Sequence, residues 1–323
     1  NRQFDQAVDE MNERRLTELW TARDASGAVE RGYNSVVFCI AQPGARDYML
    51  EQVRLAAEKT DNPTAIYIDE ANRITNPCFA PNHDHAPGAF LEAYHDFARR
   101  VRDIVPASIP LFTEYVPPET IGKYQQGALG HVPELAWSKW PSSVRSKYEA
   151  SAPHFVDLPR FAMPWLKMFH IHKNRVISNG NWFPFRYAFF NGNGYYGRGF
   201  GGKQSDGHVD PGAVDFIGNC LRVQRAHAPV FASRDVEPLV PTEQDLVFAN
   251  RFRAGGTTAW TLFNADYVTR RGTVLKVPHV EGAVYYDAWH YDEPLDPEGR
   301  NGYAYLETEI GPRGVGCLVQ RTR

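Results

Sequence analysis

The sequence predicts an α/β fold in residues 1–235, with strands and helices alternating as in a parallel barrel, and an antiparallel β-sandwich in residues 236–323. In the first part, short runs of β-branched and aromatic residues alternate with segments whose apolar residues recur at helical spacing. From about Val236 the helical period is absent, and short segments of mixed or alternating polarity are separated by turn residues. The first pattern is typical of a parallel sheet and the second of a sandwich.

Composition excludes several classes of partner and site. The formal net charge is −3 over 323 residues, with acidic and basic residues interspersed, which argues against nucleic acid and membrane surfaces as partners. No apolar run reaches the ~20 residues that span a bilayer. Cys39, Cys78, Cys220 and Cys317 are far apart and include no CxxC spacing, which argues against a zinc site and a disulfide scaffold. We therefore expect buried thiols, no metal and no cofactor.

The first strand-helix-strand unit follows a polar excursion that includes a helical patch around Phe4–Leu19. Tyr33–Ala41 predicts a strand, and Ala45–Lys59 predicts an amphipathic helix. The run TAIYIDEANR, Thr64–Arg73, then predicts a buried parallel strand that ends in Asp69 and Glu70. This acid-bearing strand is the element around which the rest of the first part is organised.

Later segments repeat the alternation. About five or six strand-helix units are visible, whereas a closed barrel needs eight strands, so we expect the first strands in an upstream region or a separate chain. The absence of an initiator Met at Asn1 fits a piece of a longer protein, and a homo-oligomer stays possible. The predicted elements are the helices Ala89–Val105, Ser142–Ala150 and Ala213–His227, and the strands Ile109–Tyr115, His154–Leu158, Leu166–His172 and Arg186–Phe190. The predicted sandwich strands are Leu246–Arg253, Thr257–Asn264, Val268–Val277, Val284–Asp287, Tyr303–Glu309 and Val315–Arg321.

Two successive predicted strands end in carboxylates, Asp69 and Glu114. The carboxyl ends of barrel strands are where the chemistry of such folds lies. Glycosidic cleavage needs one ionised carboxylate facing the anomeric carbon and a second, protonated carboxyl beside the leaving oxygen. Burial and a neighbouring negative charge keep a carboxyl protonated at neutral pH. The simpler alternative is that Asp69 caps a turn or pairs with Arg73.

Three motifs carry a resemblance to a known group: PGARDYMLEQV at Pro43–Val53, YIDEANR at the strand end, and AWTLFN with YYDAW in the terminal part. The sequence resembles the C-terminal part of a retaining glycoside hydrolase (β/α)8 TIM-type barrel with a C-terminal β-sandwich. The group is that of α-galactosidases, α-glucosidases, endo-α-N-acetylgalactosaminidases and related hydrolases of unknown specificity. The resemblance implies Asp69 as nucleophile, a carbohydrate substrate, and an extracellular or periplasmic location.

The second acid has two candidates in this resemblance. In the endo-α-N-acetylgalactosaminidase type the second acid is a Glu after the fifth barrel strand, which implies Glu114. In α-galactosidases the second acid follows the sixth strand, which implies Asp157. We prefer Glu114 because it lies at the tip of the Phe-Thr-Glu-Tyr strand. The chain departs from α-galactosidases in carrying Tyr67 where they have a Lys two residues before the nucleophile.

The remaining candidates are residues suited to sugar hydroxyls or sugar rings. His83, Asp84 and His85 could instead bind a metal with Asp69 in a metal-dependent hydrolase. His170 and His172 are as compatible with a core or rim position as with substrate binding. A non-catalytic carbohydrate-binding or structural subunit is the other alternative. The expected substrate-binding residues are Tyr67, Glu70, Asn72, Arg73, His83, His85, Asp157 and Trp182.

Overall fold

The computed structural model describes residues 15–32, 35–59, 63–69, 77–130, 156–173, 183–198 and 211–322. The chain divides into two compact units, Asn1–Gly127 and Ala128–Arg323, which we describe one at a time. Within the described ranges, every helix is too short or too polar to cross a membrane.

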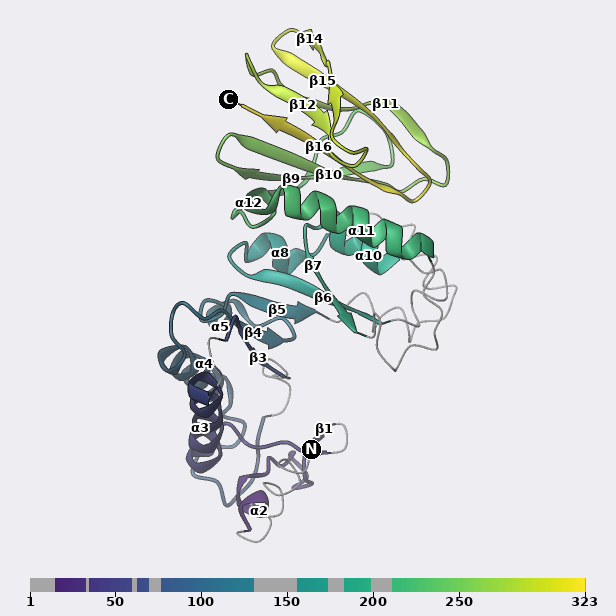
Figure 1. Ribbon diagram of the computed structural model, residues 1–323. Coiled ribbons are helices and arrows are strands. Elements are labelled where there is room, and N and C mark those ends of the chain that lie inside the picture. Colours follow the sequence, from purple (N-terminus) through teal and green to yellow (C-terminus); the bar gives the residue numbers. More distant parts are fainter. Residues whose placement is uncertain are drawn as a thin grey trace. The chain divides into compact units, whose positions relative to one another are not determined.

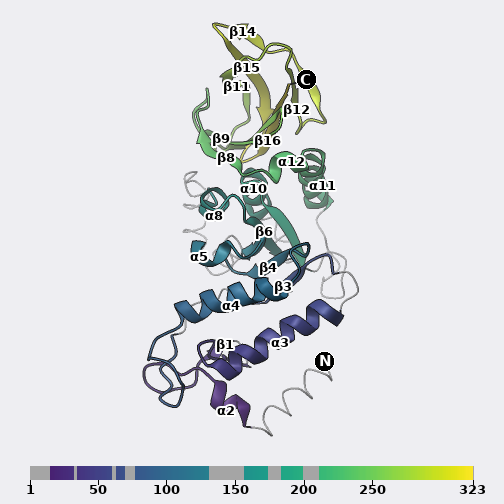
Figure 2. The ribbon, with the colours of Figure 1, turned by 90° about the vertical axis from the view of Figure 1, so that its left-hand side faces the viewer.

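The first unit packs two helices against a pair of parallel strands. Ile66, Ile68 and Leu111 of the strands meet Leu50 and Phe97 of the helices in one apolar core. In Figures 1 and 2 the two long helices, α3 and α4, run side by side. Both were predicted from their helical spacing, and the strand pair was predicted from its apolar runs. The elements are α2 (Leu16–Trp20), α3 (Pro43–Lys59), β3 (Ile66–Ile68), α4 (Leu91–Ile104), β4 (Leu111–Glu114) and α5 (Glu119–Gly122).

The predicted strand Tyr33–Ala41 is wrong as a member of the parallel sheet. Ser35–Val36 (β2) pairs antiparallel with Arg31–Gly32 (β1) in a separate two-stranded sheet. The backbone N–H of Cys39 then donates to the carbonyl of Trp20. The run therefore pairs with residues just upstream of it. Its backbone N–H and C=O groups find hydrogen-bond partners there, and closing such a short loop costs little entropy.

The second unit begins with an α/β part. Its strands β6 and β7 pair in parallel, as β3 and β4 do in the first unit. No closed barrel is found among the described residues. The elements are β5 (Gly127–Gly130), α8 (Leu158–Ala162), β6 (Lys167–Lys173), α10 (Phe183–Phe190), β7 (Gly194–Arg198), α11 (Pro211–Ala226) and α12 (Ala228–Phe231).

Two further strand predictions are wrong. At His154–Leu158, the described end is Asp157 in the N-cap position and Leu158 as the first residue of helix α8, which Pro159 favours in its first turn. Arg186–Phe190 belongs to helix α10, in which seven of eight residues are buried. A short segment that is apolar on all sides has the same pattern in a buried helix and in a buried strand, so its periodicity could not decide.

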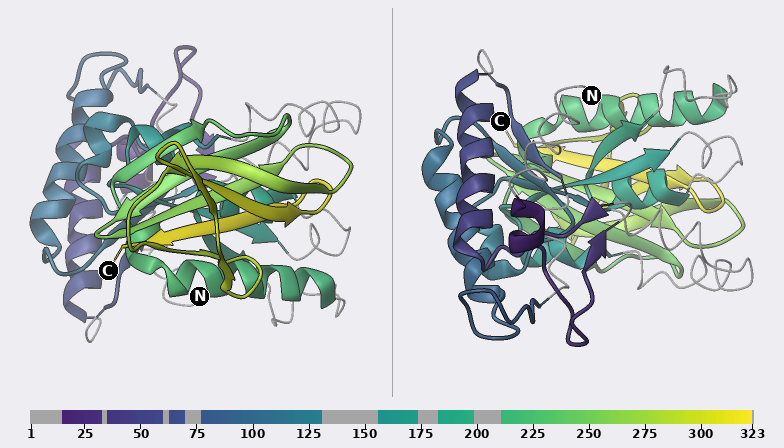
Figure 3. Two further views of the ribbon diagram at one scale, coloured as in Figure 1. Left: turned by 90° about the horizontal axis from the view of Figure 1, so that it is seen from above. Right: turned by 90° about the horizontal axis from the view of Figure 1, so that it is seen from below.

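The C-terminal part is a sandwich of a six-stranded and a three-stranded antiparallel sheet (Figure 3, left). Trp260 and Leu262 of the larger sheet meet Leu275 and Leu306 of the smaller one in a shared core. The other face of the larger sheet packs Phe252 and its neighbours on helices α10, α11 and α12. The strands are β8 (Asp235–Val240), β9 (Val247–Ala254), β10 (Thr257–Asn264), β11 (Arg270–Pro278), β12 (Val284–Asp287), β13 (Glu293–Leu295), β14 (Glu298–Arg300), β15 (Tyr303–Ile310) and β16 (Val315–Arg321).

Candidate active site

Asp69 and Glu114 lie at the carboxyl ends of two neighbouring parallel strands. The register pairs Ile68 of β3 with Thr113 of β4; Asp69 directly follows β3, and Glu114 is the last residue of β4. Neighbouring strands lie about 4.8 Å apart, so residues that end two paired strands are close together along the chain backbones.

The two acids also lie on the same face of the strand pair. Ile66, Ile68 and Leu111 pack into the core under helices α3 and α4, so their side chains point toward the helices. Successive strand residues point to opposite faces, and residues level with one another in a parallel pair share a face. Tyr67, Phe112 and Glu114 therefore point away from the helices, and the hydrogen bond from Tyr67 brings the Asp69 carboxylate to the same side.

The surroundings of the two acids differ. Asp69 is exposed, and the hydroxyl of Tyr67 donates a hydrogen bond of 3.1 Å to its Oδ1. Glu114 is buried, with 7% of its surface exposed. The next residue, Tyr115, has a φ of +62°, in the left-handed region that non-glycine residues rarely adopt. Backbone strain of this kind collects at functional sites, because the surrounding structure must hold it in place.

Several predicted site residues lie outside the described part of the chain. These are Glu70, Asn72, Arg73 and Trp182. Their predicted roles in substrate binding stay predictions, as does that of His172, whose side chain is not described.

Asp157 belongs to a buried polar network in the second unit. Its Oδ2 accepts hydrogen bonds from His170 Nε2 at 3.1 Å and from Asn193 Nδ2 at 2.5 Å. The side chain of Asn191 accepts a hydrogen bond from the backbone N–H of Asp157. At most 5% of each of these four residues is exposed. The network ties the start of α8 to β6 and to the turn before β7.

Two neighbours show how tightly this network is enclosed. Arg160 is 1% exposed, and burial lowers the pKa of its guanidinium to about 10 against the opposing effect of the Asp157 charge. Gly130 faces the imidazole of His170, and a Cβ added at position 130 would lie 2.7 Å from its Cε1 atom. The network is therefore packed against backbone with no room for another side chain.

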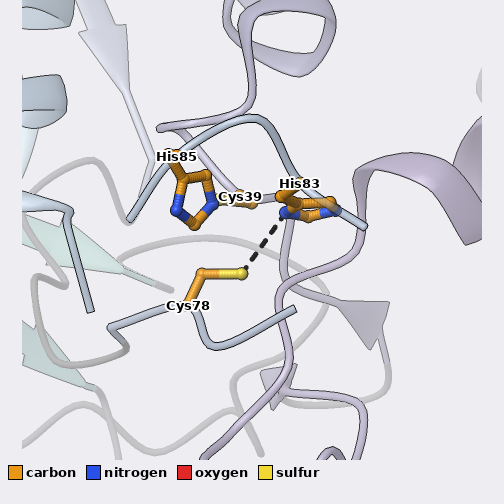
Figure 4. A group of neighbouring side chains, drawn as sticks. All are labelled: Cys39, Cys78, His83 and His85. Atoms are coloured by element: carbon orange, nitrogen blue, oxygen red, sulfur yellow. Dashed lines mark hydrogen bonds between the residues drawn. The ribbon is translucent and has the colours of Figure 1, made fainter. Parts of the chain in front are cut away.

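His83 and His85 are brought together with Cys39 and Cys78 (Figure 4). Cys39 Sγ lies 3.1 Å from His85 Nε2, and Cys78 Sγ lies 3.4 Å from His83 Nδ1. Burial, followed by the nearby Cys78, raises the pKa of the Cys39 thiol to about 12, the opposite of an activated nucleophile. Sequence reasoning missed the two cysteines because 38 residues separate them. The spacing Cys-x4-His-x-His at positions 78 to 85 was the available signal.

No known protein family matches the sequence, and no curated protein matches it. Solved structures do. The α-amylase of Anoxybacillus aligns with a TM-score of 0.57 at 10% identity, over 96% of this chain and 72% of that one. A noncanonical maltogenic α-amylase from Thermotoga neapolitana aligns with a TM-score of 0.59 at 13% identity, over 94% and 72%. A β-L-arabinopyranosidase from Geobacillus stearothermophilus aligns with a TM-score of 0.51 at 10% identity, over 94% and 68%.

At this level of identity the likeness shows a shared fold. The similar structures are TIM-barrel glycoside hydrolases with a C-terminal sheet domain, and this chain has the corresponding parallel sheet and antiparallel sheets. The prediction of a glycosidase-like fold is confirmed to that extent. The narrower resemblance to the α-galactosidase and α-glucosidase grouping stays a prediction.

Proposed function

We propose that the chain is a glycoside hydrolase that cleaves α-linked sugars with retention of configuration. The observation that supports the proposal is that Asp69 directly follows β3 and Glu114 ends the neighbouring parallel strand β4, each one residue beyond the paired Ile68 and Thr113. Retaining glycosidases hold their two carboxyl groups ~5–5.5 Å apart, a separation that side chains on adjacent strands can reach. The shared fold with glycoside hydrolases supports the same assignment.

In this mechanism Asp69 is the nucleophile. Its ionised carboxylate attacks the anomeric carbon, and the glycosidic bond breaks as a glycosyl ester forms on Asp69. The hydrogen bond donated by Tyr67 holds one carboxylate oxygen, so the other oxygen is directed at the sugar. Tyr67 thus acts as a positioning residue.

Glu114 is the general acid and base. It protonates the leaving oxygen in the first step, and as a carboxylate it then takes a proton from the water that hydrolyses the glycosyl ester. Its position as the last residue of β4, directly before Tyr115 with its positive φ, supports this role. Asp157 is less suited to the role, because its Oδ2 is engaged by His170 and Asn193 inside a closed network.

The test compares Asp69→Asn with Glu114→Gln on α-linked disaccharides and on aryl α-glycosides. Asp69→Asn should lose turnover of every substrate, because leaving-group quality cannot replace the attacking group. Glu114→Gln should lose ~10²- to 10⁴-fold on the disaccharide, the usual contribution of general acid catalysis. It should keep its first step on the aryl glycoside, whose leaving group needs little protonation.

Added azide provides the matched control. It needs no general base, so it should restore the second step of Glu114→Gln and yield a glycosyl azide, whereas it should not rescue Asp69→Asn. Equal loss on both substrates without azide rescue would move the role to Asp157. Sugar binding by wild-type protein that turns over none of the substrates would instead favour a non-catalytic carbohydrate-binding subunit.

A further inference from the structure

Four metal-binding side chains from distant parts of the first unit converge on one point. Cys39 follows the β1-β2 hairpin, whereas Cys78, His83 and His85 lie in the loop before α4. One ligand atom from each residue lies within 4.8 Å of the other three (Figure 4). In a tetrahedral zinc site with Zn–S of ~2.3 Å and Zn–N of ~2.0–2.1 Å, ligand atoms are about 3.3–3.8 Å apart. Two of the separations, 3.1 Å from Cys39 Sγ to His85 Nε2 and 3.4 Å from Cys78 Sγ to His83 Nδ1, are already close to that spacing.

The hydrogen bonding of His85 leaves a lone pair pointing into the cluster. His85 Nδ1 lies 2.9 Å from the backbone carbonyl of Ala86, and because a carbonyl only accepts, Nδ1 must carry the proton. His85 Nε2 is then unprotonated, and it is the atom that lies 3.1 Å from Cys39 Sγ. A ring nitrogen fixed by a backbone carbonyl while the other faces the metal is the usual arrangement of a metal-binding histidine.

The backbone around the cluster is fixed independently of any metal. The N–H of Gly88 donates to the carbonyl of Cys78 and closes the loop, and the N–H of Phe79 donates to the carbonyl of Arg23. The apolar cluster at this place is small: its buried members are Ala22, Cys39, Ala41, Cys78 and Ala80. Segments with so little apolar area to bury are those that structural metals stabilise.

We propose that Cys39, Cys78, His83 and His85 form a structural zinc site that ties the β1-β2 hairpin to the loop before α4. Two thiolates and two imidazoles are the ligand set of closed, four-coordinate zinc sites. Because four protein ligands fill the coordination sphere, no position is left for water or substrate. The site is thus structural, which disfavours a metal-dependent hydrolase built on His83 and His85. It is independent of the glycosidase proposal.

The test is the metal content of the chain, purified with reductant and without chelator. We expect one zinc per chain by elemental analysis and native mass spectrometry. Cobalt in place of zinc should give the intense visible bands of a tetrahedral site and a thiolate-to-metal charge-transfer band. Cys78→Ala and His83→Gln should each weaken zinc binding more than about 100-fold, beyond the 10- to 100-fold that follows loss of an outer hydrogen-bond partner.

Cys317→Ala and His279→Gln are the matched controls. Cys317 is buried in the C-terminal sandwich and His279 is exposed there, so both variants should keep one zinc. The cobalt spectrum of the wild-type chain decides the question even if a cluster variant does not fold. Failure of the reduced chain to bind zinc or cobalt would overturn the proposal. So would a Cys39–Cys78 disulfide in the purified chain if the two thiols, once reduced, bind no metal. Unchanged zinc in folded Cys78→Ala would overturn it too.

Discussion

Asp69 and Asp157 are both aspartates next to strands or helices of an α/β fold, yet their surroundings are opposite. Asp69 is exposed and has a hydrogen bond from Tyr67, whereas Asp157 is 5% exposed and accepts from His170 and Asn193. A carboxylate enclosed by its own partners stabilises the fold, and one left open at a strand end is free to meet a ligand. The sequence shows an acid near a strand in both cases, and only the partners separate the two roles.

The largest expected difference between the two aspartates is in stability. Asp157→Ala should lower the free energy of unfolding by about 3 kcal/mol, because it leaves the buried polar groups of His170 and Asn193 without their acceptor. Asp69→Ala should change it by less than about 0.5 kcal/mol, as is usual for exposed positions. Urea unfolding followed by tryptophan fluorescence measures both. Equal losses would mean that Asp69 is as structural as Asp157.

A smaller effect tests how rigidly the Asp157 network is packed. Gly130→Ala would place a Cβ 2.7 Å from Cε1 and 2.8 Å from Nδ1 of His170. The hydrogen bond from His170 Nε2 to Asp157 restrains the ring, so it cannot move away freely, and overpacking should cost about 1–3 kcal/mol. Gly218→Ala is the control: it lies in helix α11 with nothing within 4 Å, and it should stabilise by about 0.4–1 kcal/mol. If Gly130→Ala unfolds at the same urea concentration as wild type, the His170 ring can move aside to make room for the added methyl group.

Helices and strands with a clear hydrophobic period could be predicted from the sequence. Segments whose secondary structure depends on tertiary contacts could not. Helix α4 and the sandwich strands such as β10 and β16 were predicted within one or two residues, because an amphipathic helix or a turn-bounded strand is visible locally. Phe183–Phe190 was predicted in part as a strand, since a segment buried on all sides has no period to read. Helix or strand there depends on packing against the larger sheet of the sandwich.

The candidate sites divide in the same way. The placement of Asp69 and Glu114 at neighbouring strand ends could be predicted, because apolar strands that end in acids are a local signal. The convergence of Cys39 on Cys78, His83 and His85 could not, because tertiary folding brings together residues that are 39 or more positions apart in the sequence. The dispersed cysteines had argued against zinc, and that inference holds only when ligands must be close in sequence.

The smallest expected effect is a pH dependence near the buried network. Lys167 lies at the start of β6, where burial, followed by the charges of Arg160 and Arg234, lowers its pKa from 10.5 to about 8. Between pH 8 and 10.5 the folded chain has released this proton while the unfolded chain still holds it, so unfolding takes up a proton. The contribution of Lys167 to stability therefore rises with pH across that window and is constant below it.

Lys167→Met keeps the aliphatic stem and removes the titrating group, along with the hydrogen bond to the carbonyl of Pro164. Urea midpoints measured at pH 7, 8, 9 and 10 should show wild type gaining on the variant only above pH 8. Lys276→Met, at an exposed position of the smaller sandwich sheet, should follow wild type in parallel at every pH. Parallel curves for Lys167→Met as well would show that the amino group is solvated in solution. Lys167 would then lie outside the buried surroundings of Asp157 and Arg160. The contrast between buried Asp157 and exposed Asp69 would rest on the Asp157 network alone.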